Sequence, residues 1–254
     1  MKKRGQITIF IILGLILLFA AIFLIFKIAS SKKQIIVEQQ TANIEQLAPI
    51  NNYVILCIEQ VGKEALIRLG REGSLEPNAW IQTSSEKVAY FYYEGTDLFP
   101  HSIGIIERDV SNYINANLDG CLNDFASFDY PIYAKKSQLK ATTTFNQDHV
   151  VIDVTYPITA MIEESEMTIT DFNAQIPFNF IKIYEVAEDI IDETKKDEIF
   201  GPSFEFIFNL DPRPSVEIVT GTSTSIYIIE DLSQMIDNEP YVYRFAVKYD
   251  ESRL

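Results

Sequence analysis

The side chains that most often perform chemistry in proteins are sparse in this chain of 254 residues, which has 2 histidines and 2 cysteines. His101 follows Pro100, and His149 lies beside a predicted turn. Neither belongs to an HExxH spacing or has a cysteine nearby, so no zinc site is expected. The spacings GxSxG, GxxxxGK[ST] and GxGxxG, which position a nucleophile or hold a phosphate, do not occur. We therefore predict no catalytic residue, no metal ligand and no cofactor, and expect that the protein is not an enzyme.

Acidic side chains are abundant and form short runs, such as EESE over 163–166 and the pair Glu188-Asp189. Paired carboxylates could serve as the acid and base of a glycosidase or hold calcium, although no EF-hand spacing occurs. In a chain with 36 acidic and 21 basic residues, such a run is more often a solvated surface. An anchored hydrolase would require the fold to bring distant carboxylates together, and no motif indicates this.

The two cysteines, Cys57 and Cys121, are expected to form a disulfide if the body of the protein lies in an oxidising compartment. The bridge would close a loop of about 65 residues and stabilise the fold by roughly 4 kcal/mol through the lost entropy of the unfolded chain. It would link an N-terminal helix to a helix that ends near Asn117. In a reducing compartment the alternative is two unpaired buried thiols.

Four consecutive aromatic residues, Tyr90, Phe91, Tyr92 and Tyr93, are candidates for stacking on a sugar or a protein partner. They lie in the strand-like stretch KVAYFYYEG. Aromatic runs in a chain rich in strands also form half-buried strands, so the structural alternative stays open.

The stretch from Ile7 to Phe26 contains 20 residues and no charged side chain. At ~1.5 Å per residue, a helix of that length is about 30 Å long, which matches the hydrocarbon core of a bilayer. The apolar part of a cleavable secretory signal is shorter, at roughly 7–15 residues. We predict a transmembrane helix over 6–28, with the lipid bilayer as its partner.

Basic residues flank this stretch on both sides, so they give no clear orientation. Without the six basic residues of the first 33, the body retains 15 basic and 36 acidic residues, a net charge of −21. Such a body would be repelled by nucleic acid and by anionic lipid. We therefore predict no nucleic-acid partner, a cytoplasmic N-terminus and an extracytoplasmic body.

The stretch Lys2-Lys3-Arg4-Gly5-Gln6 resembles the class III signal of archaeal type IV pilins, in which basic residues and a glycine precede a long apolar helix. The resemblance implies that a prepilin-type peptidase cuts between Gly5 and Gln6. It also implies contact with other copies of the chain or with pilin-like subunits in a filament.

One position departs from the pilin pattern. Many pilins carry a glutamate at the fifth mature position, which is occupied here by Phe10. The alternative interpretation of this stretch is an ordinary, uncleaved membrane anchor with a basic flank. The rest of the chain, with its C-terminal stretch YVYRFAVK, resembles uncharacterised archaeal exported proteins that are anchored in the membrane, and this resemblance implies no function.

Several alternating patterns predict strands after residue 130. A hairpin is expected to turn at Asn146, a second one near Gly221, and the last strand is expected to carry aromatic side chains on one face. The alternating phenylalanines over 204–210 also predict a strand, whereas Ile183, Val186 and Ile190 predict a helix.

The predicted fold class is α+β: a long N-terminal hydrophobic helix, then an extracytoplasmic head with an antiparallel sheet and a few amphipathic helices. The head is long enough for one core or for two lobes divided near residue 130. The predicted segments are a leader at 1–5, the transmembrane helix at 6–28, a helical stalk at 29–72 and the head at 73–254.

Together these patterns predict a pilin-like structural or adhesion protein of the cell surface. It would be held in the membrane or in a filament core, and it would present an acidic head outside the cell. The alternative is an uncleaved, single-pass binding or sensing domain.

Overall fold

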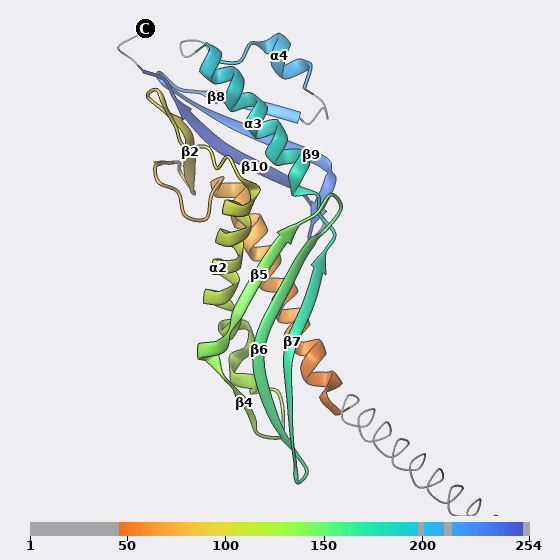
Figure 1. Ribbon diagram of the computed structural model, residues 1–254. Coiled ribbons are helices and arrows are strands. Elements are labelled where there is room, and N and C mark those ends of the chain that lie inside the picture. The colour runs from red at the N-terminus through yellow and green to blue at the C-terminus, as the bar shows by residue number, and fades with distance from the viewer. Residues whose placement is uncertain (1–45, 198–200, 211–214, 251–254) are drawn as a thin grey trace, which may run out of the picture. The chain divides into compact units, whose positions relative to one another are not determined.

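The computed structural model describes residues 46–197, 201–210 and 215–250 (Figure 1). Contacts divide the chain into two units, Met1–Pro49 and Ile50–Leu254. The second unit contains two β-sheets and several helices. Its first helix, described over 46–72, contributes residues from Ile50 onward.

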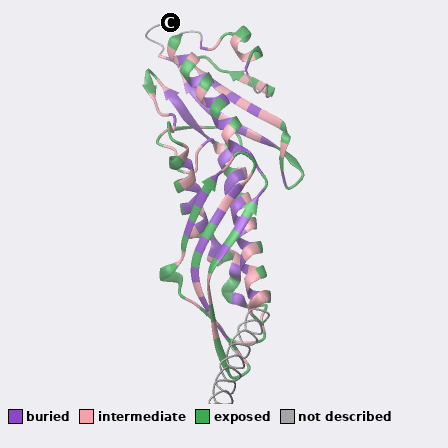
Figure 2. Ribbon diagram, turned by 45° about the vertical axis from the view of Figure 1, so that its right-hand side comes forward, coloured by how far each residue is buried: buried purple, intermediate pink, exposed green. Residues whose placement is uncertain are grey.

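The remaining elements follow in chain order. They are β1 (Trp80–Gln82), β2 (Lys87–Tyr93), β3 (Thr96–Asp97), α2 (Ile103–Leu122), η1 (Asn123–Phe125), β4 (Ile132–Ala134), η2 (Lys136–Gln138), β5 (Lys140–Phe145), β6 (Val150–Ile162), β7 (Ser165–Ile176), α3 (Phe180–Lys196), α4 (Phe204–Phe208), β8 (Ser215–Thr220), β9 (Thr224–Ile236) and β10 (Glu239–Lys248). Buried residues follow the facing sides of the strands and helices, as Figure 2 shows in purple.

Strands β4 to β7 form one antiparallel sheet, here called the inserted sheet because its strands lie in sequence between those of the other sheet. The central strand β6 pairs with β7 along one edge and with β5 and β4 in succession along the other. Its alternating apolar side chains, including Ile152 and Val154, are buried beneath the helices. The predicted hairpin at Asn146 is confirmed by the pairing of β5 with β6.

The remaining strands form the terminal sheet, in the order β1-β2-β10-β9-β8 with β3 beside β2. The last strand, β10, pairs parallel with β2 and antiparallel with β9. One face of β10 is fully covered, and its buried side chains include Tyr241, Tyr243 and Phe245. This confirms the predicted aromatic face of the C-terminal strand.

Glycines let the first helix approach both sheets. A Cβ atom on Gly62 would lie 2.5 Å from Cδ1 of Ile152 in β6, and one on Gly70 would lie 2.4 Å from the carbonyl oxygen of Val242 in β10. Gly73 ends the helix with φ of +77°, where its N–H donates to the carbonyl of Leu69 at 2.8 Å. The first helix therefore spans the junction of the two sheets and contacts each of them directly.

Side chains of α2 cover the outer edge of β5. Asn115 Oδ1 accepts from the N–H of Ala141 at 2.7 Å, and Ser111 Oγ accepts from the N–H of Thr143 at 2.8 Å. One turn earlier in the helix, Glu107 Oε1 makes the same kind of contact and accepts from the N–H of Phe145 at 2.8 Å. The spacing of four residues places these acceptors on one side of the helix. An edge that would otherwise offer free N–H groups is thus closed.

Replacing Ser111 by alanine should lower the free energy of unfolding by about 1.5 kcal/mol, because the N–H of Thr143 would be buried without an acceptor. Denaturant unfolding with the disulfide intact measures the change. The matched control is Asn117→Ala on an exposed position of the same helix, where the expected change is within about 0.5 kcal/mol. Equal losses of unfolding free energy in the two variants would show that the hydrogen bond from Thr143 to Ser111 does not stabilise the fold.

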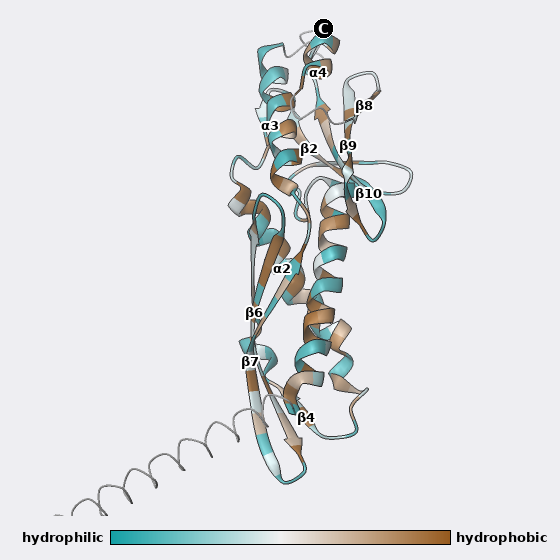
Figure 3. Cartoon of the chain, turned by 90° about the vertical axis from the view of Figure 1, so that its right-hand side faces the viewer, coloured by the Kyte–Doolittle hydropathy of each residue, from teal (hydrophilic) through white to brown (hydrophobic). Residues whose placement is uncertain are grey.

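Helix α3 packs on the terminal sheet, and its hydrophobic and hydrophilic residues separate onto different sides (Figure 3). Asn179 caps its N-terminus by accepting from the N–H of Lys182. The helix predicted around Ile190 is therefore confirmed. The strand predicted over 204–210 is wrong. That segment contains the short helix α4, whose cap is Ser203, and Phe204 is 88% exposed instead of lying on a buried strand face.

The predicted fold class also needs correction. Among the residues that the structure describes, no helix is long and apolar enough to cross a membrane, and the predicted hydrophobic helix over 6–28 lies outside them. The described helices carry charged residues on one side, as Arg68 and Glu72 do on the first helix. Nor is the sheet wholly antiparallel, because β2 and β10, distant in sequence, pair in parallel. What the structure supports is an α+β unit with two sheets.

Candidate functional site: the disulfide between the first helix and α2

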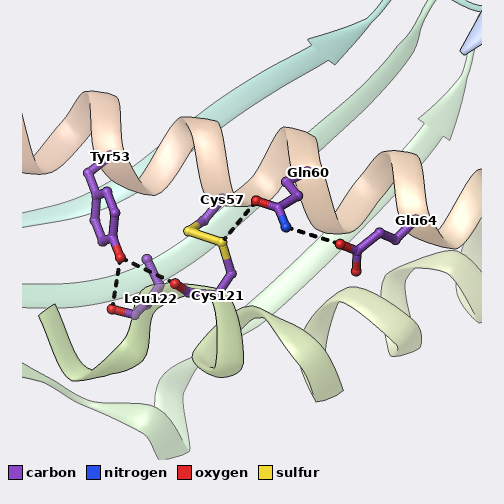
Figure 4. The surroundings of a disulfide bond; sticks show 6 residues. All are labelled: Tyr53, Cys57, Gln60, Glu64, Cys121 and Leu122. Carbon is purple, nitrogen blue, oxygen red and sulfur yellow. Dashed lines mark hydrogen bonds between the residues drawn. A yellow bond between two sulfur atoms is a disulfide. The ribbon is translucent and has the colours of Figure 1, made fainter. Parts of the chain in front are cut away.

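A disulfide joins Cys57 of the first helix to Cys121 near the end of α2 (Figure 4). The two Cα atoms lie 5.6 Å apart, although the residues are separated by 64 positions in the sequence. Cys57 is buried, with 4% of its surface exposed. The bond uses both cysteines of the chain.

Tyr53, one helical turn before Cys57, supports the same junction. Its hydroxyl donates to the backbone carbonyls of Cys121 and Leu122, each at 3.2 Å (Figure 4). These are among the last carbonyls of α2, which find no partner within their own helix. The tyrosine thus caps α2 at the point where the disulfide links it to the first helix.

Polar residues of the first helix extend along the exposed side of the disulfide. Gln60 Oε1 lies 3.8 Å from the sulfur of Cys121, and the amide of Gln60 donates to Glu64 Oε1 at 3.1 Å. A disulfide sulfur carries no proton, so the first contact is packing and not a donated hydrogen bond. The described contacts at this site hold two helices together.

The four predicted interaction aromatics lie in β2. Tyr90, Phe91 and Tyr92 are buried, with at most 9% of each exposed. The ring of Phe91 stacks on that of Phe245 in β10, with centroids 4.9 Å apart, and Phe245 stacks on Tyr227 in β9 at 5.2 Å. This row of rings ties three strands together. The three buried aromatic residues of this run therefore pack in the core, where their rings are not available to stack on a partner.

Tyr93 is the partly exposed member of the four. Lys248 Nζ lies 4.9 Å from its ring centroid and forms an ion pair with Glu94 at 2.6 Å. A role of Tyr93 in binding a partner stays a prediction.

A cavity of about 300 Å³ lies between the end of the first helix, β2 and the start of α2. Its walls combine apolar residues such as Phe91 and Ile106 with polar ones such as Glu76 and Asn78. The buried carboxylate of Asp109 borders it and accepts from Nε and Nη2 of Arg108, at 3.2 and 3.0 Å. Apolar surface with a few polar groups is the kind of lining that small ligands use.

Asp97 in β3 is the centre of a small charged cluster that joins the terminal sheet to α3. Its carboxylate accepts from Lys195 Nζ at 2.9 Å and from the N–H of Phe99 at 3.0 Å, and His101 Nε2 lies 3.0 Å away. Burial alone raises the pKa of Asp97. The hydrogen bonds from Lys195 and Phe99, with the charges of His101 and Lys195, outweigh burial and hold the pKa below its ordinary value.

Because the pKa of Asp97 is lowered on folding, its contribution to stability is present above the ordinary value of 3.8 and is lost as the pH falls through the lower, folded-state value. Asp97→Asn should therefore cost about 1 kcal/mol of unfolding free energy at pH 7, and the difference should vanish at strongly acidic pH. Unfolding curves of both proteins from pH 7 to pH 2.5 measure this. A difference that persists at acidic pH would show that the asparagine acts through packing.

The predicted processing site, Gly5 and Gln6, lies outside the described residues. Within the described ranges, no group of three or more histidine, cysteine, aspartate or glutamate side chains could hold a metal ion. The acidic run over 163–166 contains the turn between β6 and β7, where its side chains are exposed.

Sequence reasoning missed the contacts that hold the first helix against α2 and the two sheets. Tyr53, Gly62 and Gly70 lie at intervals of eight or nine residues on a predicted helix. A glycine on a helix allows another element to pack closely against it, but the sequence does not show which element that is. The carbonyls that Tyr53 contacts belong to a helix that begins fifty residues later in the chain.

A scan against protein-family models finds no family that matches the chain, and searches of curated proteins and of solved structures find no match either. The similarity of Gly5 and Gln6 to a pilin signal therefore stays a prediction.

Proposed function

We propose that this protein is a pilin-like structural or adhesion protein of the cell surface, with its acidic body outside the cell. The observation that carries the proposal is the disulfide between Cys57 and Cys121. Disulfides persist in oxidising compartments and are rare in a reducing cytosol. An exported body also agrees with its large negative charge, which keeps it soluble and apart from anionic lipid.

The disulfide also suits a protein that bears load. The first helix continues the chain from its N-terminal side, so tension from that side reaches the body through this helix. The disulfide of Cys57 transmits the tension covalently to α2. Helix α2 is in turn hydrogen-bonded to β5 through Ser111. Without the bond, only non-covalent contacts, such as the hydrogen bonds of Tyr53, would hold the N-terminal part of the first helix on α2.

The proposal assigns partners to the N-terminal part of the chain. The apolar stretch over 7–26 attaches the protein to the lipid bilayer, and a prepilin-type peptidase cuts between Gly5 and Gln6. The mature chain then contacts other copies of itself or related subunits. Phe10 replaces the glutamate that many pilins carry, so any such contact would use apolar packing at that position.

The alternative function is a single-pass binding or sensing domain that is never cut. The cavity bordered by Asp109 and Arg108 favours it, because a wall of apolar and polar groups could hold a small ligand. Retention of the residues before Gln6 in the native protein would support this alternative.

Protease treatment of intact cells tests where the body lies. If the body is outside, an antibody against it should lose its signal without lysis, and the undigested protein should run faster on a gel before reduction than after it. A body protected until the cells are lysed, with both thiols free to react with maleimide, would overturn the proposal. A cytoplasmic protein in the same cells serves as the control for lysis.

A further inference from the structure

Strand β8 forms one edge of the terminal sheet and pairs only with β9 among the described strands. At the hairpin, the N–H of Gly221 donates to the carbonyl of Thr224 at 2.7 Å, and the register continues with Val219 opposite Ile226. Directly bonded pairs alternate along an antiparallel ladder. The odd-numbered residues of β8 therefore bond to β9, and the backbone groups of Val216, Ile218 and Thr220 point outward.

The other described edges differ from that of β8 in capping, length or charge. The six-residue edge of β5 is capped by Ser111 and its neighbours on α2, whereas no hydrogen bond from the described residues reaches the outward groups of β8. Strands β1, β3 and β4 have only two or three residues each. Strand β7 is longer, but it carries Glu166 and Asp171, and its ladder is interrupted by a bulge; both features discourage pairing.

The side chains of β8 allow this edge to pair with the same edge of a second copy. If two copies pair antiparallel about Ile218, Val216 lies opposite the partner's Thr220, and Glu217 lies opposite the partner's Val219. No glutamate then faces a glutamate directly, which would be unfavourable. The bonded pairs fall on the outward-pointing residues, so the two strands can exchange up to about six hydrogen bonds, two for each bonded pair.

Apolar surface at the same edge supports the pairing. Val219 is 49% exposed and belongs to a cross-strand row with Ile226, Ala246 and Tyr90. The row is covered at Ala246 and Tyr90 and open at Val219. In the antiparallel pair, the aliphatic carbons of the partner's Glu217 would lie beside Val219.

We propose that β8 is an interface between two copies of this chain, which pair edge to edge and join their terminal sheets. The contact uses the same strand on both copies, so it closes as a two-fold pair and cannot extend into a filament by itself. The net charge of −15 on each chain opposes association, so added salt should strengthen it. The inference uses only described residues of β8 and stands whether or not the proposed surface function holds.

Cross-linking between two singly substituted full-length proteins in detergent micelles tests the register. In the proposed pair, position 217 of one copy and position 219 of the other form a non-bonded pair with Cα atoms about 4.5 Å apart, within reach of a disulfide. The distance between the two copies of position 217 is about 7–8 Å, beyond that reach. A mixture of Glu217→Cys and Val219→Cys should thus give a disulfide-linked dimer under mild oxidation, at several times the yield of either variant alone.

Two further variants complete the test. Thr144→Cys, exposed on the inserted sheet, controls for random collisions and for exchange with the native disulfide. Thr220→Pro removes an outward N–H without touching a bond to β9, and added to both cysteine proteins it should lower the cross-linked yield about tenfold. Yields that are equal in the mixture and in the single variants, or that do not change with the proline, would overturn the inference. Because the yield depends on β8 alone, it is independent of where the protein lies in the cell.

Discussion

Loss of the disulfide is expected to lower the free energy of unfolding by about 4 kcal/mol, because the bond closes a loop between residues 64 positions apart. The bond restricts the unfolded chain, and it also holds α2 on the first helix beside Tyr53. The change is made by reduction of the wild-type protein or by Cys57→Ala with Cys121→Ala. Guanidinium unfolding with and without reductant measures it.

The double alanine variant is also the control. Reductant should shift the unfolding midpoint of the wild-type protein and leave that of the variant unchanged. The reduced wild type and the variant should agree to within about 1 kcal/mol, because Cys57 is buried and its replacement leaves a small gap. A midpoint that is the same before and after reduction would contradict the role of the bond as a staple between the helices.

Gly70→Ala is expected to destabilise the fold by about 3 kcal/mol. The added Cβ would lie 2.4 Å from the carbonyl oxygen of Val242 and 2.8 Å from the ring of Tyr241, both in β10. A backbone oxygen cannot turn aside as a flexible side chain can, so the first helix would have to move away from the terminal sheet. Such a shift would also strain the hydrogen bond from the hydroxyl of Tyr241 to the carbonyl of Leu66.

Gly120→Ala is the matched control, since this glycine also lies in a helix and an added Cβ would meet nothing within 4 Å. There the change should be neutral or stabilising by up to about 1 kcal/mol, because alanine favours the helix more than glycine does. Both variants are compared by denaturant unfolding with the disulfide intact. A Gly70 variant as stable as the Gly120 variant would show that the first helix does not pack as closely on β10 as the structure indicates.

Local patterns predicted most elements of the body. The hairpin at Asn146 and the face of β10 that carries Tyr243 follow from alternation over short distances. The alternation of aromatic and other residues around Phe206 is compatible with a strand, but the segment caps itself at Ser203 and forms a single turn of helix. A short apolar run does not distinguish a helix from a strand, because five residues are too few to separate the helical period of about 3.6 from the strand period of about 2.

The arrangement of the sheets could not be predicted from local patterns. β2 and β10 pair in parallel although more than 140 residues separate them, and a complete sheet is inserted between. The cysteine count, together with the expected export of the body, suggested the bond between Cys57 and Cys121. The contacts of Gly70 and the capping of β5 by Ser111 depend on partners distant in the sequence, and residue types alone do not specify such partners.

The most direct test of the proposed surface function is the intact mass of the native protein, isolated from membrane and surface fractions without reduction. We expect a chain that begins at Gln6 and is about 2 Da lighter than its reduced form, for the two hydrogens lost when Cys57 and Cys121 join. A chain that still carries Gly5 and the basic residues before it, or one whose mass does not change on reduction, would show that the proposed pilin-like function is wrong.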